Sequence, residues 1–473
     1  MVSGVEVDTI AALSTAPGVS AIAVVRISGP RAAAVLARVA PGLEPVPPRE
    51  ACVAAIIDPV TNETIEQAVV TQYPAPASYT GEDVVEISGH GGWLGPALVL
   101  DACLAGGARL AEAGEFTRRA YLNGRMDLLQ AEAVVDLIEG RSQALRRMAL
   151  RQLDRGLSER VAALRASLLG LEALLVHHID FPEEDDAPIP VTHIAERADE
   201  LSNSLAALLE TAAEGELLRE GALVVLAGRP NSGKSSLYNA LLGQERAIVT
   251  EVPGTTRDAL EAAVSLGGFP FRLVDTAGLR ETDDRVERMG VNVARRYLAA
   301  ADVVLLCVEG TRTLGTDERD FVRDTGVPVV VVRTKADLDV TAVHSGRLEI
   351  ARDRALATGG TGGPEDACAT LSVSALAGDG LGELRALLPR LVYRGLLGTG
   401  ADSPVLTRAR QARAVGRALS EVRSFAAALR KGAGPEIAAA HLRVTESALE
   451  ELVGVITGEE VLDRVFAEFC IGK

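Results

Sequence analysis

The chain has 473 residues, a formal net charge of −17, and a composition that is 48% hydrophobic but only 3% aromatic. This length predicts about two to four domains with aliphatic cores, and the acidic balance excludes bulk binding of nucleic acid, so an RNA substrate would need a local basic patch or a partner protein. Five cysteines without paired or metal-like spacing, a start without signal-peptide features, and the lack of an uninterrupted apolar run of roughly 20 residues predict a cytoplasmic protein with no membrane segment.

The first two segments of the chain differ in their hydrophobic period. Residues 1–125 mix strand-like runs, such as 21–25 and 83–87, with short helical patterns punctuated by glycine and proline. This mixture predicts a small α+β domain. Over 126–217, apolar residues instead recur at helical spacing, which predicts long antiparallel helices broken at the acidic turn 180–188.

The remaining two segments suggest an insertion. Strands alternate with helices over 218–390, which predicts a doubly wound α/β domain. Helical spacing then returns over 391–473. The predicted fold class is therefore multidomain α/β and α: an α+β N-terminal domain, and a helical-bundle domain into which a doubly wound domain with a phosphate-binding loop is inserted.

The string GRPNSGKSS at 228–236 is the strongest chemical signal in the chain. It follows the apolar run 222–227 and precedes a helical pattern, which is the strand–loop–helix setting of a phosphate-binding loop. Its glycines allow backbone N–H groups to turn inward, and the helix N-terminus adds partial positive charge. Lys234 can reach the β- and γ-phosphates of a nucleotide, and the Ser235 hydroxyl can hold Mg²⁺.

Two further strings supply groups for the metal and the γ-phosphate. DTAG at 275–278 follows an apolar strand, so Asp275 can hold Mg²⁺ through water while the Gly278 N–H meets the γ-phosphate. PGTTRD at 253–258 supplies Thr256, which can contact both Mg²⁺ and the γ-phosphate.

The base is indicated by two strings that follow later strands. In TKAD at 334–337, the Asp337 carboxylate suits the N1–H and N2–H₂ edge of guanine, and Lys335 can lie along the ring. SAL at 374–376 can offer a backbone N–H to guanine O6. These five strings resemble a translation-factor-like GTPase, with Thr334 where Asn is usual. The predicted guanine-nucleotide site comprises Asn231, Ser232, Gly233, Lys234, Ser235, Ser236, Thr250, Glu251, Val252, Pro253, Gly254, Thr255, Thr256, Asp275, Thr276, Ala277, Gly278, Thr334, Lys335, Ala336, Asp337, Ser374, Ala375 and Leu376.

The residue after DTAG departs from the common hydrolytic arrangement. Many GTPases place Gln there to orient the attacking water, but this chain has Leu279, which carries no amide. A monovalent cation could supply the missing charge, with Asn231 offering a side-chain oxygen and Thr250 and Val252 offering backbone oxygens. Glu287 is then the best remaining group to orient water, although spacing alone favours a solvated surface charge.

Long strings outside the nucleotide block carry a resemblance that spans residues 8–473. They include VVRISG at 24–29, YTGEDVVEISGHGG at 79–92, AGEFTRRAYLNGRMDLLQAEAVVDLI at 113–138 and the terminal FCIGK. With these strings the chain resembles the MnmE (TrmE) family of tRNA-modification GTPases. The resemblance implies a folate-binding and dimerising N-terminal domain over 1–125, a helical domain split into 126–217 and 391–473, and a GTPase domain over 218–390.

The resemblance also implies an activity and its cofactors. The family forms homodimers, hydrolyses GTP with K⁺ and Mg²⁺ when two GTPase domains meet, and works with the FAD-containing partner MnmG. Together they place a carboxymethylaminomethyl or aminomethyl group on C5 of the wobble uridine of tRNA, with the one-carbon unit taken from methylene-tetrahydrofolate.

Site residues follow from the resemblance motif by motif. It places Ser235 and Thr256 on Mg²⁺, Asn231, Thr250, Val252 and Thr255 on K⁺, and Glu287 and Lys234 in catalysis. A tetrahydrofolate derivative is expected at Arg26, Glu86, Arg125 and Lys473. Arg125 replaces a Lys common in the family, which keeps the charge but changes the geometry. Apart from Lys473, Cys470 lacks sequence neighbours that would activate a thiol, so a mostly structural role is expected.

Three functions stay open at this stage. The first is a GTP-driven subunit of a tRNA-modifying enzyme, and the second is a regulatory GTPase whose only chemistry is hydrolysis. The third is a folate-dependent transferase in which the GTPase domain is dispensable. Arg26, Glu86 and the FCIGK tail distinguish the first from the second.

Overall fold

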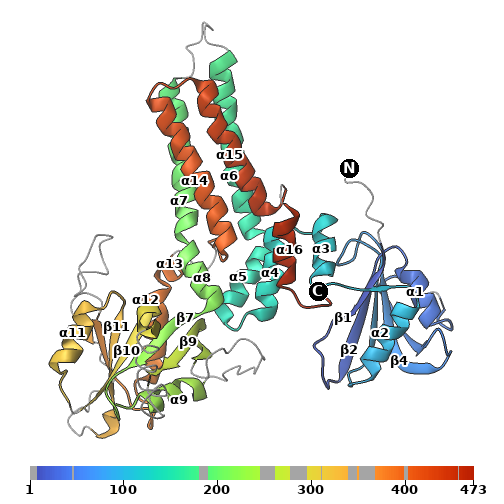
Figure 1. Ribbon diagram of the computed structural model, residues 1–473, viewed down its shortest axis with the longest axis horizontal. Helices are drawn as coiled ribbons and strands as arrows, with labels where there is room; N and C mark the ends of the chain where they lie inside the picture. The colour runs from blue at the N-terminus through green and yellow to red at the C-terminus, as the bar shows by residue number, and fades with distance from the viewer. Residues whose placement is uncertain are drawn as a thin grey trace. The chain divides into compact units, whose positions relative to one another are not determined.

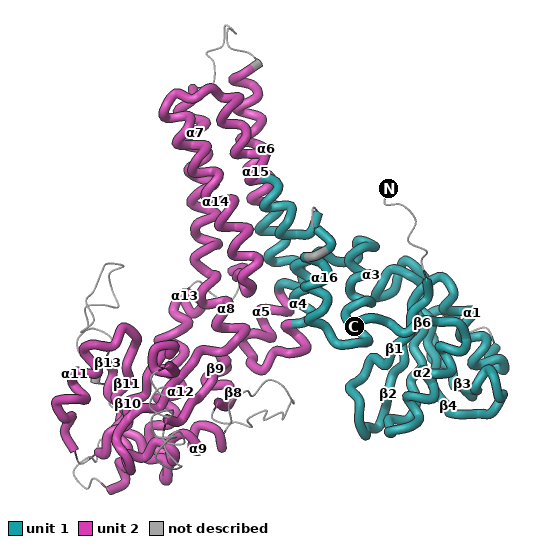
Figure 2. The backbone as a smooth tube through the Cα atoms, in the orientation of Figure 1, with its two compact units in different colours: residues 1–135, 152–162, 446–473 teal, residues 136–151, 163–445 magenta. Residues whose placement is uncertain are grey.

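The computed structural model describes residues 8–44, 47–180, 190–244, 261–276, 296–310, 312–338, 349–350, 368–398, 403–455 and 458–473. The chain forms two compact units (Figure 2). Unit 1 comprises residues 1–135, 152–162 and 446–473, and unit 2 comprises residues 136–151 and 163–445. The division falls inside helices and so differs from the four segments drawn from sequence pattern, which stay a prediction.

Unit 1 is built on an α+β sheet with the strand order β3-β4-β5-β2-β1-β6 (Figure 1). Its strands pair antiparallel except for the parallel pair β1–β6. The strands are β1 (Ile10–Leu13), β2 (Ile22–Ser28), β3 (Ala51–Ile57), β4 (Thr64–Tyr73), β5 (Val84–His90) and β6 (Arg109–Leu110), and the helices are α1 (Ala32–Val39), α2 (Gly95–Ala105), α3 (Glu115–Leu122) and α16 (Glu459–Ala467).

Alternation along the strands of unit 1 decides which face of the sheet is covered. Val25 and Ile27 of β2 and Val85 and Ile87 of β5 are buried against α1 and α2. Because successive side chains of a strand point to opposite faces, the residues between them, including Arg26, point to the other face. That face carries the second candidate site described below.

Unit 2 contains a sheet with the order β12-β13-β11-β10-β7-β9-β8, in which β7, β9, β10, β11 and β13 run parallel. The strands are β7 (Ala222–Ala227), β8 (Glu261–Leu266), β9 (Phe269–Asp275), β10 (Val303–Glu309), β11 (Val329–Thr334), β12 (Glu349–Ile350) and β13 (Cys368–Ser372). The accompanying helices are α9 (Lys234–Gln244), α11 (Thr316–Asp324), the 3₁₀ turn η2 (Ala336–Leu338), α12 (Leu381–Val392) and α13 (Arg394–Gly398).

The central strand β7 explains why this sheet is doubly wound. All six of its residues are buried. Ala222, Val224 and Leu226 belong to one apolar cluster, while Leu223 and Val225 belong to another on the opposite face. A strand that is buried on both faces has a continuous apolar sequence, and residues 222–227 show this pattern.

The helical part contains α4 (Leu128–Glu139), α5 (Gln143–Leu153), α6 (Gly156–Asp180), α7 (Val191–Glu210), α8 (Ala212–Glu220), α14 (Ala409–Arg430) and α15 (Pro435–Val453). Within unit 2, α7 and α14 pack along each other (Figure 1). In α6 the buried residues Leu164, Leu168, Leu171 and Leu175 recur every three or four positions, which forms the apolar stripe of a bundle helix. The fold class predicted from the sequence is confirmed.

One described helix, over Gly156–Ile179, is long and apolar enough to cross a membrane by length and composition. Charged residues interrupt this stretch, so it contains no uninterrupted apolar run of roughly 20 residues. Length and composition are weak evidence, because core helices of globular proteins pass the same test.

Candidate functional site

The predicted phosphate-binding loop lies where β7 ends and α9 begins. Gly228, Asn231 and Gly233 adopt positive φ angles of 142°, 63° and 84°. A Cβ atom on Gly228 would lie 2.4 Å from the carbonyl oxygen of Cys307, so only glycine fits there. The loop therefore depends on its two glycines, and it ends at the N-terminus of α9, where partial positive charge favours an anion.

Lys234 and Ser235 form the start of α9. The Lys234 ammonium is buried and donates to the carbonyl oxygens of Gly228 at 3.0 Å and Arg229 at 2.8 Å, which holds the cation inside the loop. The exposed Ser235 hydroxyl donates to Oδ2 of Asp275 at 2.7 Å. Asp275 ends β9 beside Leu226 of β7, so two residues 40 positions apart meet at the edge of the sheet.

The Ser235 hydroxyl and the Asp275 carboxylate form an oxygen donor set of the kind that Mg²⁺ prefers. The next residue, Thr276, donates its hydroxyl to the Leu226 carbonyl oxygen at 2.7 Å. This bond ties the end of β9 to the end of β7, so the arrangement of the two oxygen donors is supported by its neighbour.

Thr334 connects the predicted base-binding string to the phosphate-binding loop. Its buried hydroxyl donates to the Ser232 carbonyl oxygen at 2.7 Å and lies 3.3 Å from that of Val308. The departure from Asn therefore keeps a polar link across the site. The next residue, Lys335, has a φ of 58°, and its ammonium pairs with Oε1 of Glu309 at 2.9 Å.

The two predicted base-reading strings meet at Asp337 and Ser374. The Ser374 hydroxyl donates to Oδ1 of Asp337 at 2.7 Å and also accepts the Ala377 N–H at 3.1 Å. Ser374 is fully buried, while Asp337 is exposed and the Leu376 side chain is 90% exposed. The hydroxyl thus orients a carboxylate whose other oxygen can accept hydrogen bonds from a base.

Several predicted residues lie outside the described part of the chain. They are Thr250, Glu251, Val252, Pro253, Gly254, Thr255, Thr256, Ala277, Gly278, Leu279 and Glu287. Among the described ones, Ser236 is exposed on α9, while Ala336 and Ala375 are half-buried next to Asp337 and Ser374. The structure therefore brings together the phosphate-loop, Asp275 and base-binding strings.

A cluster beside the phosphate-binding loop was not predicted from the sequence. Glu318 on α11 is buried, pairs with Arg312, accepts the Gly315 N–H at 2.8 Å and lies 3.4 Å from Arg229. Burial raises the pKa of Glu318, but the hydrogen bonds from Arg312 and Gly315 outweigh it and lower the pKa overall. Arg229 lies within the loop, so the cluster joins the loop to α11. The sequence offered only a Glu six residues after an Arg, which is too common to be informative.

The second candidate site lies on the face of the unit 1 sheet that is opposite α1 and α2. Arg26 on β2 stands directly opposite Glu86 on β5, and its Nε and Nη2 donate to Oε1 of Glu86 at 3.0 and 2.8 Å. The guanidinium carbon lies 5.3 Å from the ring centre of Tyr79 and 5.7 Å from that of Phe116. Nη1 is buried, and no described residue forms a hydrogen bond with it.

The unpaired Nη1 is informative because a buried guanidinium donor without a partner is costly. A ligand oxygen would satisfy it. Both bonds from Arg26 go to Oε1 of Glu86, so Oε2 can accept N–H groups from a ligand. The pair therefore suits a ligand that offers an oxygen acceptor next to N–H donors, which is the pattern of a pterin ring.

The C-terminal tail reaches this same site. The Phe116 N–H donates to the backbone oxygen of Lys473 at 3.2 Å, and the Ser14 hydroxyl donates to the carbonyl oxygen of Gly472 at 3.1 Å. Burial and the positive charge of Arg26 lower the pKa of the Lys473 side chain, against the opposing effect of Glu86. Three of the four residues predicted to contact folate are therefore neighbours, although they come from both ends of the chain.

The fourth residue, Arg125, is exposed and its side chain lies beside Gly81, where a Cβ atom would be 3.2 Å from Cγ of Arg125. No described contact joins Arg125 to Arg26, Glu86 or Lys473. Cys470 is a free, exposed cysteine whose carbonyl oxygen lies 3.5 Å from the Gly114 nitrogen. The same carbonyl oxygen accepts the Lys473 N–H at 3.3 Å, and the Cys470 thiol acts electrostatically on the pKa of Lys473.

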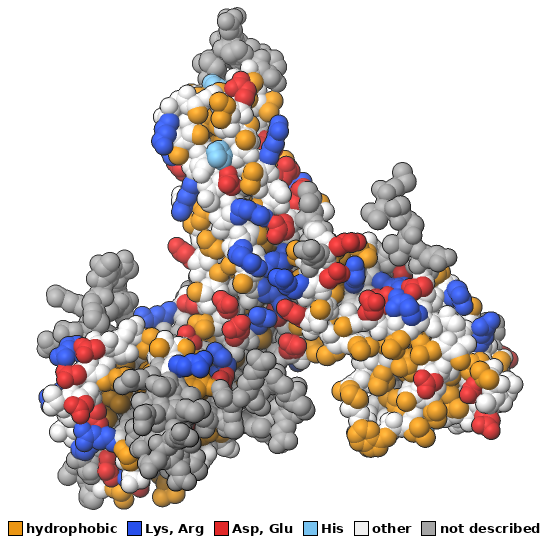
Figure 3. Space-filling view, in the orientation of Figure 1, with side chains coloured by type: hydrophobic (Ala, Val, Ile, Leu, Met, Phe, Trp, Pro, Cys, Tyr) orange, Lys and Arg blue, Asp and Glu red, His pale blue; other side chains and the backbone are white. Residues whose placement is uncertain are grey.

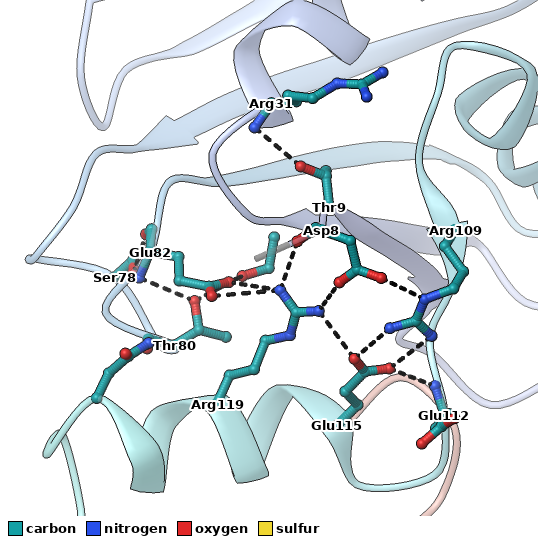
Figure 4. A network of polar contacts seen from close by, with 12 residues as sticks. Asp8, Thr9, Arg31, Ser78, Thr80, Glu82, Arg109, Glu112, Glu115 and Arg119 are labelled. Atoms are coloured by element: carbon teal, nitrogen blue, oxygen red, sulfur yellow. Dashed lines mark hydrogen bonds and ion pairs between the residues drawn. The ribbon is translucent and has the colours of Figure 1, made fainter. Parts of the chain in front are cut away.

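An ionic network holds α3 beside this site (Figure 4). Arg119 pairs with Asp8 and Glu115 at 2.6 and 2.9 Å and with Glu82 at 3.3 Å. Glu82 also accepts the Ser28 hydroxyl at 2.7 Å. Because α3 carries Phe116, the network helps position the ring that lies next to Arg26. No property of the sequence alone showed that these charges would converge.

Comparison with known proteins gives matches along the whole chain. A family model described as the MnmE helical domain matches residues 128–470, and one described as the GTP-binding protein TrmE N-terminus matches residues 9–125. A curated protein of Heliobacterium modesticaldum, described as tRNA modification GTPase MnmE, is 42% identical over 476 residues, which cover 98% of this chain and 99% of that protein. A protein of Moorella thermoacetica with the same description is 42% identical over 477 residues, with coverages of 98% and 99%.

Solved structures match more distantly. A variant of Era from Aquifex aeolicus bound to GDP and AlF₄⁻ is 23% identical, with a TM-score of 0.26, and the match covers 42% of this chain and 66% of that one. The FeoB G domain of Methanococcus jannaschii is 19% identical, with a TM-score of 0.25 and coverages of 36% and 97%. Scores this low carry no argument about the present chain.

Proposed function

The chain belongs to the MnmE family of tRNA modification GTPases, and on that basis we propose that it couples GTP hydrolysis to folate-dependent modification of tRNA. The modification is the addition of a carboxymethylaminomethyl or aminomethyl group to C5 of the wobble uridine. The observation that best supports the GTPase part is the convergence of four motif strings through the pairs Ser235–Asp275, Thr334–Ser232 and Asp337–Ser374.

In this proposal the loop residues bind the phosphates and the later strings bind guanine. Lys234 moves its ammonium from the loop carbonyls to the β- and γ-phosphate oxygens of GTP, and Asp337 accepts the N–H groups of guanine. Ser235 and Asp275, together with Thr256, would hold Mg²⁺, which supplies positive charge to the phosphates when bound. Ser374 keeps the Asp337 carboxylate in its orientation.

We further propose that hydrolysis depends on K⁺. The support is the lack of an amide at Leu279 and the position of Asn231 inside the loop with a left-handed backbone. Asn231 would hold the ion with Thr250, Val252 and Thr255, and Glu287 would orient the attacking water. GTP turnover is then expected to be much faster in KCl than in NaCl at equal ionic strength, and equal rates would contradict these roles.

The Arg26–Glu86 site is proposed to bind the tetrahydrofolate derivative. The unpaired Nη1 of Arg26 would donate to the pterin carbonyl oxygen, and Oε2 of Glu86 would accept the amide and amino N–H groups. Lys473 and Arg125 would contribute positive charge toward the glutamate tail. The Glu86→Gln variant removes the carboxylate but keeps the size, so it should lose 5-formyl-tetrahydrofolate in equilibrium dialysis, whereas Glu44→Gln, a distant matched change, should bind normally.

We propose a homodimer as the working form, with MnmG as the partner. The support for self-association is a group of large apolar side chains that unit 1 leaves exposed, and Figure 3 shows hydrophobic side chains gathered over the part of this unit that holds β1, β2 and α2. Large exposed apolar patches on soluble chains commonly mark interaction sites. The exposed large apolar residues of unit 1 include Val19, Ile22, Val53, Val69, Trp93 and Leu94. We expect the complex to be cytoplasmic.

One reconstitution separates this function from the two alternatives. The purified chain, its FAD-containing partner, tRNA, GTP, K⁺ and methylene-tetrahydrofolate are combined, and the modified nucleoside is measured by mass spectrometry. Lys234→Ala should abolish modification, whereas a transferase with a dispensable GTPase domain would retain it. A regulatory GTPase predicts that the wild-type mixture leaves the wobble uridine unchanged, and that result would refute our proposal.

A further inference from the structure

The starts of α5 and α14 carry arginines and no acidic residue, although the whole chain has a net charge of −17. Over 141–151 the four charged residues are Arg141, Arg146, Arg147 and Arg151, and over 404–420 they are Arg408, Arg410, Arg413 and Arg417. Both stretches belong to unit 2. We call these two stretches the arginine face.

The arrangement of α5 directs its arginines outward. Ala144, Leu145 and Met148 are buried in the apolar cluster that includes β7, and the Ala144 N–H donates to the Gly268 carbonyl oxygen at 2.9 Å. Arg146 and Arg147 occupy the opposite, exposed side of the helix. Figure 3 shows Lys and Arg side chains gathered where Figure 1 labels α5.

A buried ion pair joins the residue before α14 to the end of α4, which leads into α5. Nη2 of Arg408, the residue before α14, lies 2.9 Å from Oδ1 of Asp136, and both side chains are buried. Asp136 lies near the end of α4, and a Cβ atom on Gly140 would lie 2.5 Å from the Asp136 carbonyl oxygen and 3.5 Å from Leu145 of α5. The first turns of α5 and α14 therefore share one region of unit 2.

Four exposed arginines of this region, Arg141, Arg146, Arg147 and Arg413, form no ion pair with any residue that the structure describes. Elsewhere, exposed arginines such as Arg197 and Arg323 pair with a carboxylate of their own helix, at 2.7 and 2.6 Å. Within the described ranges, the side chains of Arg141, Arg146 and Arg147 form no hydrogen bond or ion pair, and that of Arg413 bonds only to a backbone oxygen of α14. Their charge is thus available to an external anion.

We propose that the arginine face binds the phosphate backbone of the substrate tRNA. This inference rests on the proposed function, because tRNA modification requires a polyanion to approach a chain that repels it on average. Guanidinium groups bind phosphate oxygens through paired hydrogen bonds, and phosphate contacts set the position of an RNA without reading its sequence. The face therefore positions the tRNA and does not select the base.

The test compares two double variants that each remove two positive charges. Arg146→Gln with Arg147→Gln alters the arginine face, and Arg197→Gln with Arg323→Gln alters exposed arginines that are already paired. Fluorescence anisotropy measures the affinity of each chain for fluorescein-labelled tRNA over a range of KCl concentrations. The first variant should bind roughly tenfold more weakly. The slope of log K against log [KCl] should also become less steep, by about 0.9 for each phosphate contact removed. The second should bind like the wild type.

Further readouts separate the possible failures. GTP turnover and thermal unfolding of the first variant should match the wild type, since neither arginine lies in the nucleotide site. Equal tRNA binding by the two variants would overturn the inference, as would a wild-type chain that modifies tRNA with its partner but binds none alone. If the first variant no longer binds the FAD-containing partner but binds tRNA as tightly as the wild type, the arginine face is a protein interface. That result would also overturn the inference. Failure of modification by the wild type would instead refute the proposed function.

Discussion

Replacing Thr334 by Val tests whether its hydroxyl joins the base-binding and phosphate-binding parts of the nucleotide site. The hydroxyl is buried and donates to the Ser232 carbonyl oxygen at 2.7 Å. Valine keeps the branched shape and removes the donor, so the Ser232 oxygen loses a partner inside the site. A net hydrogen bond contributes about 0.5–1.5 kcal/mol, and an orphaned buried acceptor costs about 1–3 kcal/mol.

We expect a combined effect of about 1–2 kcal/mol on nucleotide binding, which corresponds to a 5- to 30-fold higher Kd. Binding of a fluorescent GDP analogue measures that Kd, and urea unfolding of the apo protein measures how much of the loss is general stability. Thr334→Ser is the matched control, because it keeps the hydroxyl and loses only a methyl group. Equal nucleotide affinity for the Val and wild-type chains would refute the reasoning.

Three more predictions follow from the described contacts. Asp337→Asn should shift base preference from guanine toward xanthine, because an amide offers a donor where the carboxylate accepts, and competition between GTP and XTP measures this. Tyr393→Phe should lower the free energy of unfolding by about 1–2 kcal/mol in urea, because its buried hydroxyl lies 2.8 Å from the Pro270 carbonyl oxygen. Hydrogen bonding to Arg109 lowers the pKa of Asp8, and Arg109 and Arg119 lower that of Glu115 against burial. Their stabilisation is therefore complete above the unfolded carboxyl pKa of about 4 and is lost as the pH falls through the lower folded values. The hydrogen-exchange protection factors of β1, which correct for the intrinsic pH dependence of exchange, should therefore fall in acid and stay high at pH 8.

The fold class and the order of the nucleotide motifs were predictable because each depends on short stretches of chain. The strand β7 is buried on both faces, so it appears as an unbroken apolar run. Gly228 and Gly233 adopt backbone angles that favour glycine, so the loop has a recognisable string. Leu164, Leu168 and Leu171 recur at the period of a helix because one face of α6 is buried.

Contacts between distant residues were decided by the tertiary structure. Ser235 meets Asp275, and Lys473 reaches Arg26, only because strand order and the C-terminal tail bring them together. Spacing along the chain contains no information about such meetings, since a side-chain contact depends on the path of the backbone between its partners. The role of Thr334 illustrates the difference: the sequence showed a departure from Asn, and the fold showed which carbonyl oxygen its hydroxyl binds.

The sequence by itself thus indicated the MnmE family, a guanine-nucleotide site and candidate folate-binding residues, because each of these features depends on a short local motif. The tertiary structure decided which oxygens and guanidinium groups face each other. It left Nη1 of Arg26 buried without a described partner, and it joined the start of α14 to the end of α4, just before α5, through Arg408 and Asp136. Neither result follows from composition, because a net charge of −17 for the whole chain does not show where its arginines lie in the fold.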